Sequence, residues 1–395
     1  MAAALRIGRV LGIPIYLHLT FLVILPLFVY LFSAPGGSSD QGRLFGMDMN
    51  FKGLDAPLWV KYAFGTAATV IFFITILIHE LAHSYLAQKY GVRIKGITLM
   101  IFGGVSQMEE IPRQPRQEWR MAFAGPLASL LIGIGTLGAM LLLKSLRPGS
   151  VLLDGTITLL GLMAVYNVLL AGFNLLPAFP MDGGRLLRAF YAARMPYVEA
   201  TRKAAKVGRY FAIGLAVFGI FYNFLLILIA LFVYIGATEE EQATAISESL
   251  QGIQVKQLMS PAVQVVHPDM SVQQLHDLML TTRYMGFPVV DGTLVGIVTL
   301  SDTHKVPRDR VPFARVRDIM TKEVVTVPPD MEAAKALAVL SQRRIGRLVV
   351  TEGANIVGIV TKKDFLRAVD VISARSRATI WGEQFPPQTP PPPPM

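Results

Sequence analysis

Residues 58–86 read LWVKYAFGTAATVIFFITILIHELAHSYL, an apolar run long enough to cross a lipid bilayer as one helix. Near the end of this run lies His79-Glu80-Leu81-Ala82-His83. Residues four apart on a helix share one face, so both imidazoles can reach a single ion while Glu80 flanks it as a proton acceptor. Two histidines and a glutamate are costly inside an apolar segment unless they have partners or a function. The segment predicts a zinc site in a transmembrane helix; the alternative is a set of interfacial residues at a helix end.

Other apolar segments surround this one. The chain has 395 residues, of which 53% are hydrophobic and 16% charged, which suits several membrane crossings followed by a soluble part. The segment 204–235 is long enough for two short spans joined by a turn at 219–223. We therefore expect a polytopic α-helical membrane domain with about six transmembrane helices. The remaining predicted spans are 13–32, 121–143 and 157–176, of which the first has a signal peptide as its alternative interpretation.

The distribution of positive charge sets the expected orientation. The net charge is +10, and Lys and Arg concentrate in the segments that six spans place on the cytoplasmic side. This places both termini in the cytoplasm and makes anionic lipid headgroups, not nucleic acid, a sufficient partner for the excess charge. The chain has no cysteine, which excludes disulfides and thiolate metal sites. The segments expected outside hold only Arg43, Lys52, Lys144 and Arg147.

A zinc hydrolase needs a third protein ligand and an open position for water. The candidate is Asp182, in the segment NLLPAFPMDGG that begins at Asn174, at the inner end of the fourth predicted span. Pro177 and Pro180 break the helix there, and the glycines after Asp182 free the backbone, so the carboxylate can turn sideways. Depth agrees, because the rise along a helix puts His79 about 25 Å from the outer boundary, near the cytoplasmic end where Asp182 lies.

This pair of motifs resembles the site-2 protease family of intramembrane zinc metalloproteases. The resemblance covers about residues 1–240 and rests on His79–His83, on Asn174–Gly184 and on Ala124-Gly125-Pro126, with Met181 where leucine is commoner. It implies a zinc-dependent endopeptidase that cuts transmembrane segments of membrane-anchored proteins in regulated intramembrane proteolysis, as a multi-pass protein of a prokaryotic plasma membrane. It further implies that one zinc ion per chain is bound by His79, His83 and Asp182, that Glu80 is the catalytic acid and base, and that Asn174 positions or stabilises the substrate carbonyl.

The segment 94–111, between the second and third predicted spans, is rich in β-branched residues and interrupted by Gly103-Gly104. We expect it to form a β-hairpin at the inner membrane interface. Backbone groups at that depth must be paired internally or face protein or water, so an exposed strand edge there is a docking site for an unwound substrate strand. The alternative is a simple connector.

An internal repeat follows the acidic residues 239–241. Val255-Lys-Gln-Leu-Met259 is echoed by Val316-Arg-Asp-Ile-Met320, and Gly296-Ile-Val-Thr-Leu-Ser-Asp302 is echoed by Gly358-Ile-Val-Thr-Lys-Lys-Asp364. These copies resemble a tandem pair of cystathionine-β-synthase-type (CBS) domains, an α+β module. We expect a membrane domain at 1–240, a linker at 241–252, CBS domains at 253–306 and 312–372, and a disordered Pro-rich tail at 373–395.

The second resemblance also implies a ligand. In that family a Thr and an Asp of each copy contact the ribose and phosphate of an adenine nucleotide, AMP, ADP or ATP. Both copies keep both residues, as Thr299 with Asp302 and Thr361 with Asp364. The alternative is a purely structural module that forms a homodimer. The expected function is a zinc protease that cuts transmembrane substrates under nucleotide control, against a CBS-regulated channel or transporter, or a non-proteolytic membrane scaffold.

Overall fold

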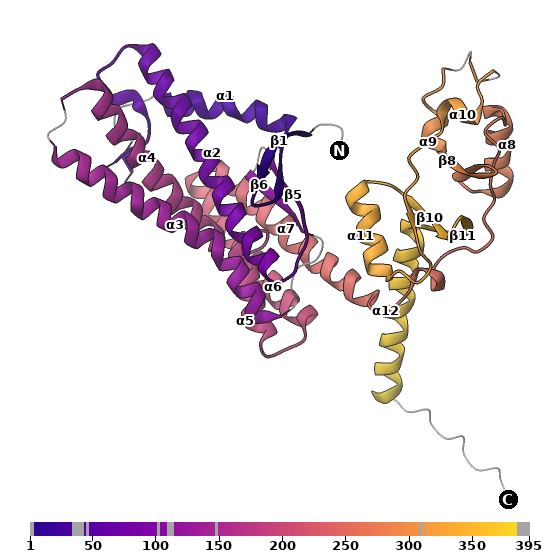
Figure 1. The fold of residues 1–395 in the computed structure, drawn as a ribbon. Helices are drawn as coiled ribbons and strands as arrows, with labels where there is room; N and C mark the ends of the chain where they lie inside the picture. Colours follow the sequence, from indigo (N-terminus) through magenta and orange to yellow (C-terminus); the bar gives the residue numbers. More distant parts are fainter. Residues whose placement is uncertain are drawn as a thin grey trace, which may run out of the picture. The chain divides into compact units, whose positions relative to one another are not determined.

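The structure is a computed structural model that describes residues 4–33, 43–44, 47–100, 103–108, 114–146, 149–307, 310–311 and 313–384. The chain divides into two compact units, Met1–Gln242 and Ala243–Met395 (Figure 1). The predicted Pro-rich tail lies outside the described residues from residue 385 onward. Its first part differs from the prediction, because helix α12 (Lys362–Gln384) continues through residues 373–384, which contain no proline to stop it.

In the described part of the chain, four helices are long and apolar enough to cross a membrane. α7 (Phe224–Ser249) is apolar only in its first half, and it follows α6 after a break at Asn223, inside the predicted turn. The first unit is therefore a helical membrane domain, while the count of six spans and the cytoplasmic placement of both termini stay predictions. The four candidate spans are α2 (Leu58–Lys89), α3 (Pro115–Ser145), α4 (Val151–Asn174) and α6 (Tyr197–Tyr222).

The segment 13–32, predicted as the first span, is not one helix. It begins as strand β2 (Ile13–His18), which pairs antiparallel with β1 (Ala4–Val10). Alternate side chains at the start of β2 are buried, which is the period of a strand and not of a helix. The helix that follows, α1 (Leu19–Ser33), has 15 residues. At a helical rise this is about 22 Å, short of the hydrocarbon thickness.

A four-stranded sheet in the order β1-β2-β5-β6 lies beside α2 (Figure 1). β5 (Ile94–Met100) pairs in parallel with β2 and antiparallel with β6 (Gly103–Met108), and β6 forms one edge of this sheet. β5 and β6 come from the segment 94–111, of which residues 101–102 and 109–111 lie outside the described part. The location of this hairpin at the membrane interface stays a prediction.

Aromatic side chains pack α1, α2 and α4 together. Phe21 of α1 meets Phe73 of α2 edge to face at 4.5 Å between ring centroids. Tyr166 of α4 meets Phe32 at 5.2 Å and Phe72 at 5.5 Å. Such pairs add specific geometry to the burial of large apolar surfaces, so they hold α2, which carries the HExxH-type motif, in one position. The short elements of this unit are β3 (Arg43–Leu44), β4 (Met47–Asp48), η2 (Phe51–Gly53) and α5 (Asp182–Ala192).

The second unit repeats one α+β pattern twice. In each copy a helix precedes two antiparallel strands, and a further helix begins directly after the second strand. The first copy contains α8 (Val272–Thr282), β7 (Gly286–Asp291), β8 (Thr293–Thr299) and α9 (Leu300–Thr303), and the second contains β9 (Thr326–Val327), α11 (Ala333–Arg343), β10 (Arg347–Glu352), β11 (Asn355–Thr361) and α12.

The opening segments of the two copies are exchanged. η3 (Val255–Gln257) opens the first copy, yet Val255 is buried in the core of the second copy and its N–H donates to the Met331 carbonyl at 2.9 Å. α10 (Val316–Ile319) opens the second copy, yet Val316 is buried in the core of the first copy and donates to the Met270 carbonyl at 2.9 Å. Each copy thus buries an apolar side chain of the other, and the module is two interleaved folds instead of two consecutive ones.

Candidate metal centre

Three buried side chains converge where α2 meets the start of α5. Nε2 of His79 lies 3.3 Å from Oδ2 of Asp182, and Nε2 of His83 lies 3.0 Å from the same oxygen. The two Nε2 atoms are 3.2 Å apart. Within the described residues this is the group of acidic and histidine side chains whose ligand atoms gather closely enough to hold one metal ion. The fold therefore brings His79 and Asp182 into contact although they are 103 residues apart in the sequence.

Contacts from α3 orient both imidazoles. Nδ1 of His83 lies 2.7 Å from the carbonyl oxygen of Met121, which can only accept a hydrogen bond. Nδ1 of His83 therefore carries the proton, and the lone pair of Nε2 is free to bind a metal. Nδ1 of His79 lies 2.9 Å from the hydroxyl of Ser129, which orients the ring and can either donate or accept the hydrogen bond. The sequence singled out neither Met121 nor Ser129, since a backbone carbonyl leaves no sequence signal and a serine in an apolar helix is common.

The chain between α4 and α5 turns the Asp182 carboxylate toward the histidines. α4 ends at Asn174, and α5 begins at Asp182 itself. The two glycines that follow are required by close packing: a Cβ at Gly183 would collide with the carbonyl oxygens of Leu175 and Leu176. A Cβ at Gly184 would lie 2.6 Å from the backbone nitrogen of Phe179. The two glycines after Asp182 therefore allow the first turn of α5 to pack directly on the loop that precedes it.

Gly125 of α3 keeps the space beside the histidines open. A Cβ at this position would contact Nε2 of His83 and would lie 2.6 Å from Nε2 of His79. The volume that a methyl group would fill is thus the volume next to both ligand atoms. Two imidazole nitrogens and one carboxylate oxygen fit the donor set of a catalytic zinc ion, and glycine at position 125 adds no side chain beside them.

The other predicted site residues of the membrane domain are Glu80 and Asn174. Glu80 is half-buried on α2, and a Cβ at Gly104 would collide with its Cγ, so β6 passes directly along the Glu80 side chain. Asn174, at the last turn of α4, donates from Nδ2 to the carbonyl of Leu170 at 2.9 Å. Glu80 thus lies next to the cluster because it follows His79 directly on α2.

In the second unit the predicted Thr and Asp pairs form matching local structures. In the first copy Thr299 Oγ1 donates to Oδ2 of Asp302 at 2.6 Å, and in the second copy Thr361 Oγ1 donates to Oδ2 of Asp364 at 2.7 Å. Asp302 is buried and also accepts from Lys305 at 2.8 Å. Burial alone would raise the pKa of Asp302, but the hydrogen bonds from Lys305 and Thr299 outweigh it and lower the pKa.

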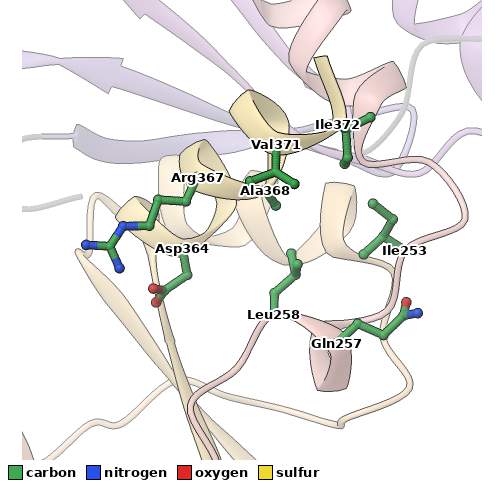
Figure 2. Close-up of a pocket in the computed structure, with 8 residues that line it drawn as sticks. All are labelled: Ile253, Gln257, Leu258, Asp364, Arg367, Ala368, Val371 and Ile372. Carbon is green, nitrogen blue, oxygen red and sulfur yellow. The ribbon is translucent and has the colours of Figure 1, made fainter. Parts of the chain in front are cut away.

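An open pocket of about 400 Å³ lies beside the second pair (Figure 2). One wall is the start of α12, which contributes Asp364 and Arg367. The opposite wall is the opening segment of the first copy, with Leu258 and Gln257. Its lining is mostly apolar with a few polar groups, a composition that small-molecule sites share. Its remaining lining residues are Ile253, Ala368, Val371 and Ile372.

A membrane domain whose helices bring two histidines and an aspartate together beside a glutamate defines a membrane-bound zinc metalloprotease. Comparison with known families agrees. The family model described as Peptidase family M50 matches residues 67–145 and 136–215, and the model described as CBS domain matches residues 255–306 and 316–371.

Relatives extend the match to nearly the whole chain. The chain is 36% identical over 377 residues to a zinc metalloprotease of Methanocaldococcus jannaschii, covering 95% of this chain and 98% of that one. It is 32% identical over 389 residues, 94% of each chain, to a Mycobacterium tuberculosis protein whose name, Rip3, describes it as a zinc metalloprotease. A solved structure of a site-2 protease from Methanocaldococcus jannaschii covers 60% of this chain and 95% of that one, at 36% identity and a TM-score of 0.40. The chain belongs to the site-2 protease family, Peptidase family M50, and carries a pair of CBS domains.

Proposed function

We propose that this chain is an intramembrane zinc endopeptidase that cuts transmembrane segments of membrane-anchored proteins, with a CBS pair that binds adenine nucleotide. The observation that carries the first part is the convergence of His79, His83 and Asp182 beside Glu80, on and next to helices long enough to span a bilayer. A channel, a transporter or a scaffold has no need of this donor set with a carboxylate poised next to it. Homodimer formation through the CBS pair stays a prediction.

The chain's own residues supply the proton chemistry of peptide hydrolysis. Zinc held by the three ligand side chains would polarise the scissile carbonyl and make water nucleophilic near neutral pH. Glu80 can accept a proton from the attacking water and deliver it to the leaving amine. The second amide hydrogen of Asn174 Nδ2 can be donated to the substrate carbonyl, since the first is held by Leu170.

The substrate has to be extended at the cleavage site, because a helical backbone keeps its carbonyls in hydrogen bonds. β6 is the edge strand of the sheet, and through Gly104 it lies against Glu80. A substrate strand added to β6 would run past Glu80 with its backbone exposed to attack. This supports strand addition as the way in which an unwound transmembrane segment is presented.

Replacing Asp182 by Ala tests the ligand assignment. We expect the variant to bind zinc at least about 10- to 100-fold more weakly than the parent, the loss that removal of even an outer-shell partner produces. Zinc content after gel filtration of the full chain, measured by mass spectrometry of the metal, checks this. Asp154→Ala, a half-buried carboxylate at the start of α4, is the control and should keep its zinc. A full equivalent of zinc in Asp182→Ala would contradict the assignment.

For the CBS pair we propose that the nucleotide binds in the pocket of the second copy. Apolar side chains such as Leu258 suit a purine, Asp364 suits ribose hydroxyls, and Arg367 suits a phosphate. In the first copy, Lys305 already pairs with the buried Asp302. Asp364 lies instead on the wall of an open pocket, which favours the second copy.

Replacing Asp364 by Ala should lower the affinity of the full chain for AMP by about tenfold or more, because hydrogen bonds to a charged group contribute about 1.5–3 kcal/mol. Calorimetric titration of AMP and ATP into the detergent-solubilised protein measures the change. Asp370→Ala is the matched control, since Asp370 lies on the same helix, is exposed and does not line the pocket. Heat of binding that is identical in Asp364→Ala and the parent would contradict this location, and no heat in the parent would leave a structural module.

A further inference from the structure

Arg188 is a fully buried cation on the helix that begins with Asp182. α5 starts at Asp182, and Arg188 lies on its second turn with no exposed surface. Its Nε donates to Oε1 of Glu118 at 2.7 Å, and its Nη1 donates to Oε1 of Glu240 at 2.5 Å. Burial alone would lower the pKa of Arg188, but the neighbouring carboxylates hold it above its ordinary value, so the guanidinium stays charged.

The partners of Arg188 come from the elements that surround α5. Glu118 lies on α3 and Glu240 lies on α7. The guanidinium also lies over the ring of Phe179, in the loop before α5, at 5.1 Å, and over the ring of Tyr197, on α6, at 4.9 Å. A buried guanidinium is tolerated only with partners of this kind, and a shift of α5 would break several of them together. Arg188 therefore fixes the position of α5 against its neighbours.

α7 presents one face to the loop 178–181, which leads directly into Asp182. Val233 and Ala237 are fully buried in clusters with residues of this loop. A Cβ at Gly236 would lie 2.6 Å from a proline ring of the loop, so the helix backbone approaches it closely. Glu240 follows on the same face, three residues after Ala237 and seven after Val233. One helix thus packs on the loop and also holds the carboxylate that pairs with Arg188.

We propose that Arg188 is a positioning residue for the metal centre and that Glu240 is the carboxylate through which α7 holds it in place. The inference rests on the proposed role of Asp182 as a zinc ligand. The direction of the Asp182 carboxylate is set by the loop 178–181 and the first turn of α5. Arg188 holds α5 from its second turn, and Glu240 anchors Arg188 to the helix that packs on the same loop.

Glu241 provides a matched comparison within the same helix. It is the next residue of α7, and it pairs with Arg209 of α6 at 2.5 Å, the same distance as Glu240 from Arg188. The exposed fractions of the two glutamate side chains are also alike, 24% for Glu241 and 29% for Glu240. The difference is the partner: Arg209 is not on the helix that carries Asp182. Loss of Glu241 costs α7 its ion pairs with Arg209 and Arg202, both on α6, whereas loss of Glu240 costs the ion pair with Arg188 on α5. Only the loss of Glu240 therefore weakens the hold on α5.

The test compares zinc release from Glu240→Ala and Glu241→Ala, using the full chain loaded with zinc in detergent and a chromogenic chelator as the acceptor. We expect Glu240→Ala to release zinc about tenfold faster than the parent, in the range seen when the support of a metal ligand is removed. Glu241→Ala should stay within about twofold of the parent, as substitutions away from such a feature do. Glu240→Gln keeps an oxygen that can accept from Nη1 and should fall between the parent and Glu240→Ala. Cleavage of a membrane-anchored substrate should show a lower kcat for Glu240→Ala with a nearly unchanged KM.

The outcomes separate this inference from the proposed function. If the parent binds no zinc, the proposed assignment of the zinc ligands is wrong. If the parent binds zinc but both alanine variants release it at one rate, or Glu240→Gln is no better than Glu240→Ala, the positioning role is overturned. Should Glu240→Ala not fold, Arg188→Lys serves instead, because it keeps the charge but loses the two-pronged contact with Glu118 and Glu240. Zinc release from that variant at the rate of the parent would equally overturn the proposal.

Discussion

Replacing Glu80 by Gln should abolish peptide cleavage while zinc remains bound. Glu80 follows His79 in sequence but is not one of the three side chains that we propose as zinc ligands. Gln has nearly the same shape, so the packing of Gly104 against this side chain is kept, but an amide cannot take a proton from water. Loss of a positioned general base typically costs about 10²- to 10⁴-fold in rate, and here the same group also serves as the general acid.

Two measurements on one preparation check this expectation: cleavage of a membrane-anchored substrate in vesicles, and zinc per chain by mass spectrometry of the metal. Glu199→Gln, an exposed carboxylate near the start of α6, is the control for the charge change and should cleave like the parent. Turnover by Glu80→Gln at the rate of the parent would refute the role of Glu80. The inactive variant also traps substrates, because they enter and are not cut, and their identification by mass spectrometry addresses the substrate class.

The convergence of His79, His83 and Asp182 could be predicted from sequence because its signals are local. The spacing of His79 and His83 defines one face of a helix, and the prolines and glycines around Asp182 mark the place where a helix stops and a side chain can turn inward. The fold brings these two segments together as the sequence predicts. The supports from Ser129 and Met121 depend on which face of α3 meets α2, and such packing leaves little trace in a single sequence.

The prediction of residues 13–32 as one transmembrane helix was wrong for a related reason. Residues 13–18 are as apolar as a helix would be, and composition alone cannot separate the two. They become a strand because they pair with β1 on one side and with β5 on the other, and β5 follows α2 in the chain. The exchange of opening segments in the CBS pair has the same origin. A repeat shows that two segments are alike, but not which copy buries each of them.

Arg188 shows how a buried charge can be mistaken for a surface charge. In the sequence it belongs to a basic segment and supports the expected orientation in the membrane. In the structure it has no exposed surface, and its carboxylate partners lie 70 and 52 residues away along the chain. No local sequence pattern predicts an ion pair between residues this far apart in the chain. Charge counts therefore indicate orientation only for the residues that the fold leaves at the surface.

Replacing Gly125 by Ala should empty the metal centre without unfolding the protein. Alanine is favoured over glycine inside a helix by about 1 kcal/mol, so α3 itself gains from the change. The new methyl group, however, would contact Nε2 of His83 and lie 2.6 Å from Nε2 of His79. A zinc ion sits about 2.0–2.1 Å from such nitrogens, so the methyl group and the ion compete for one volume. We expect zinc content and cleavage both to fall to background, whereas Glu80→Gln loses cleavage alone.

The control is Gly135→Ala, about three turns further along the same helix, where a Cβ would meet nothing within 4 Å. It should keep zinc and activity, and its thermal unfolding midpoint should equal or exceed that of the parent because the helix gains without a steric cost. Circular dichroism of both variants shows whether Gly125→Ala is folded when its zinc is measured. If folded Gly125→Ala holds a full equivalent of zinc, the ion does not lie between α2 and Gly125. The imidazoles would then have to bind it from their other side, and the contact between Nδ1 of His83 and the Met121 carbonyl would have to break for this to happen.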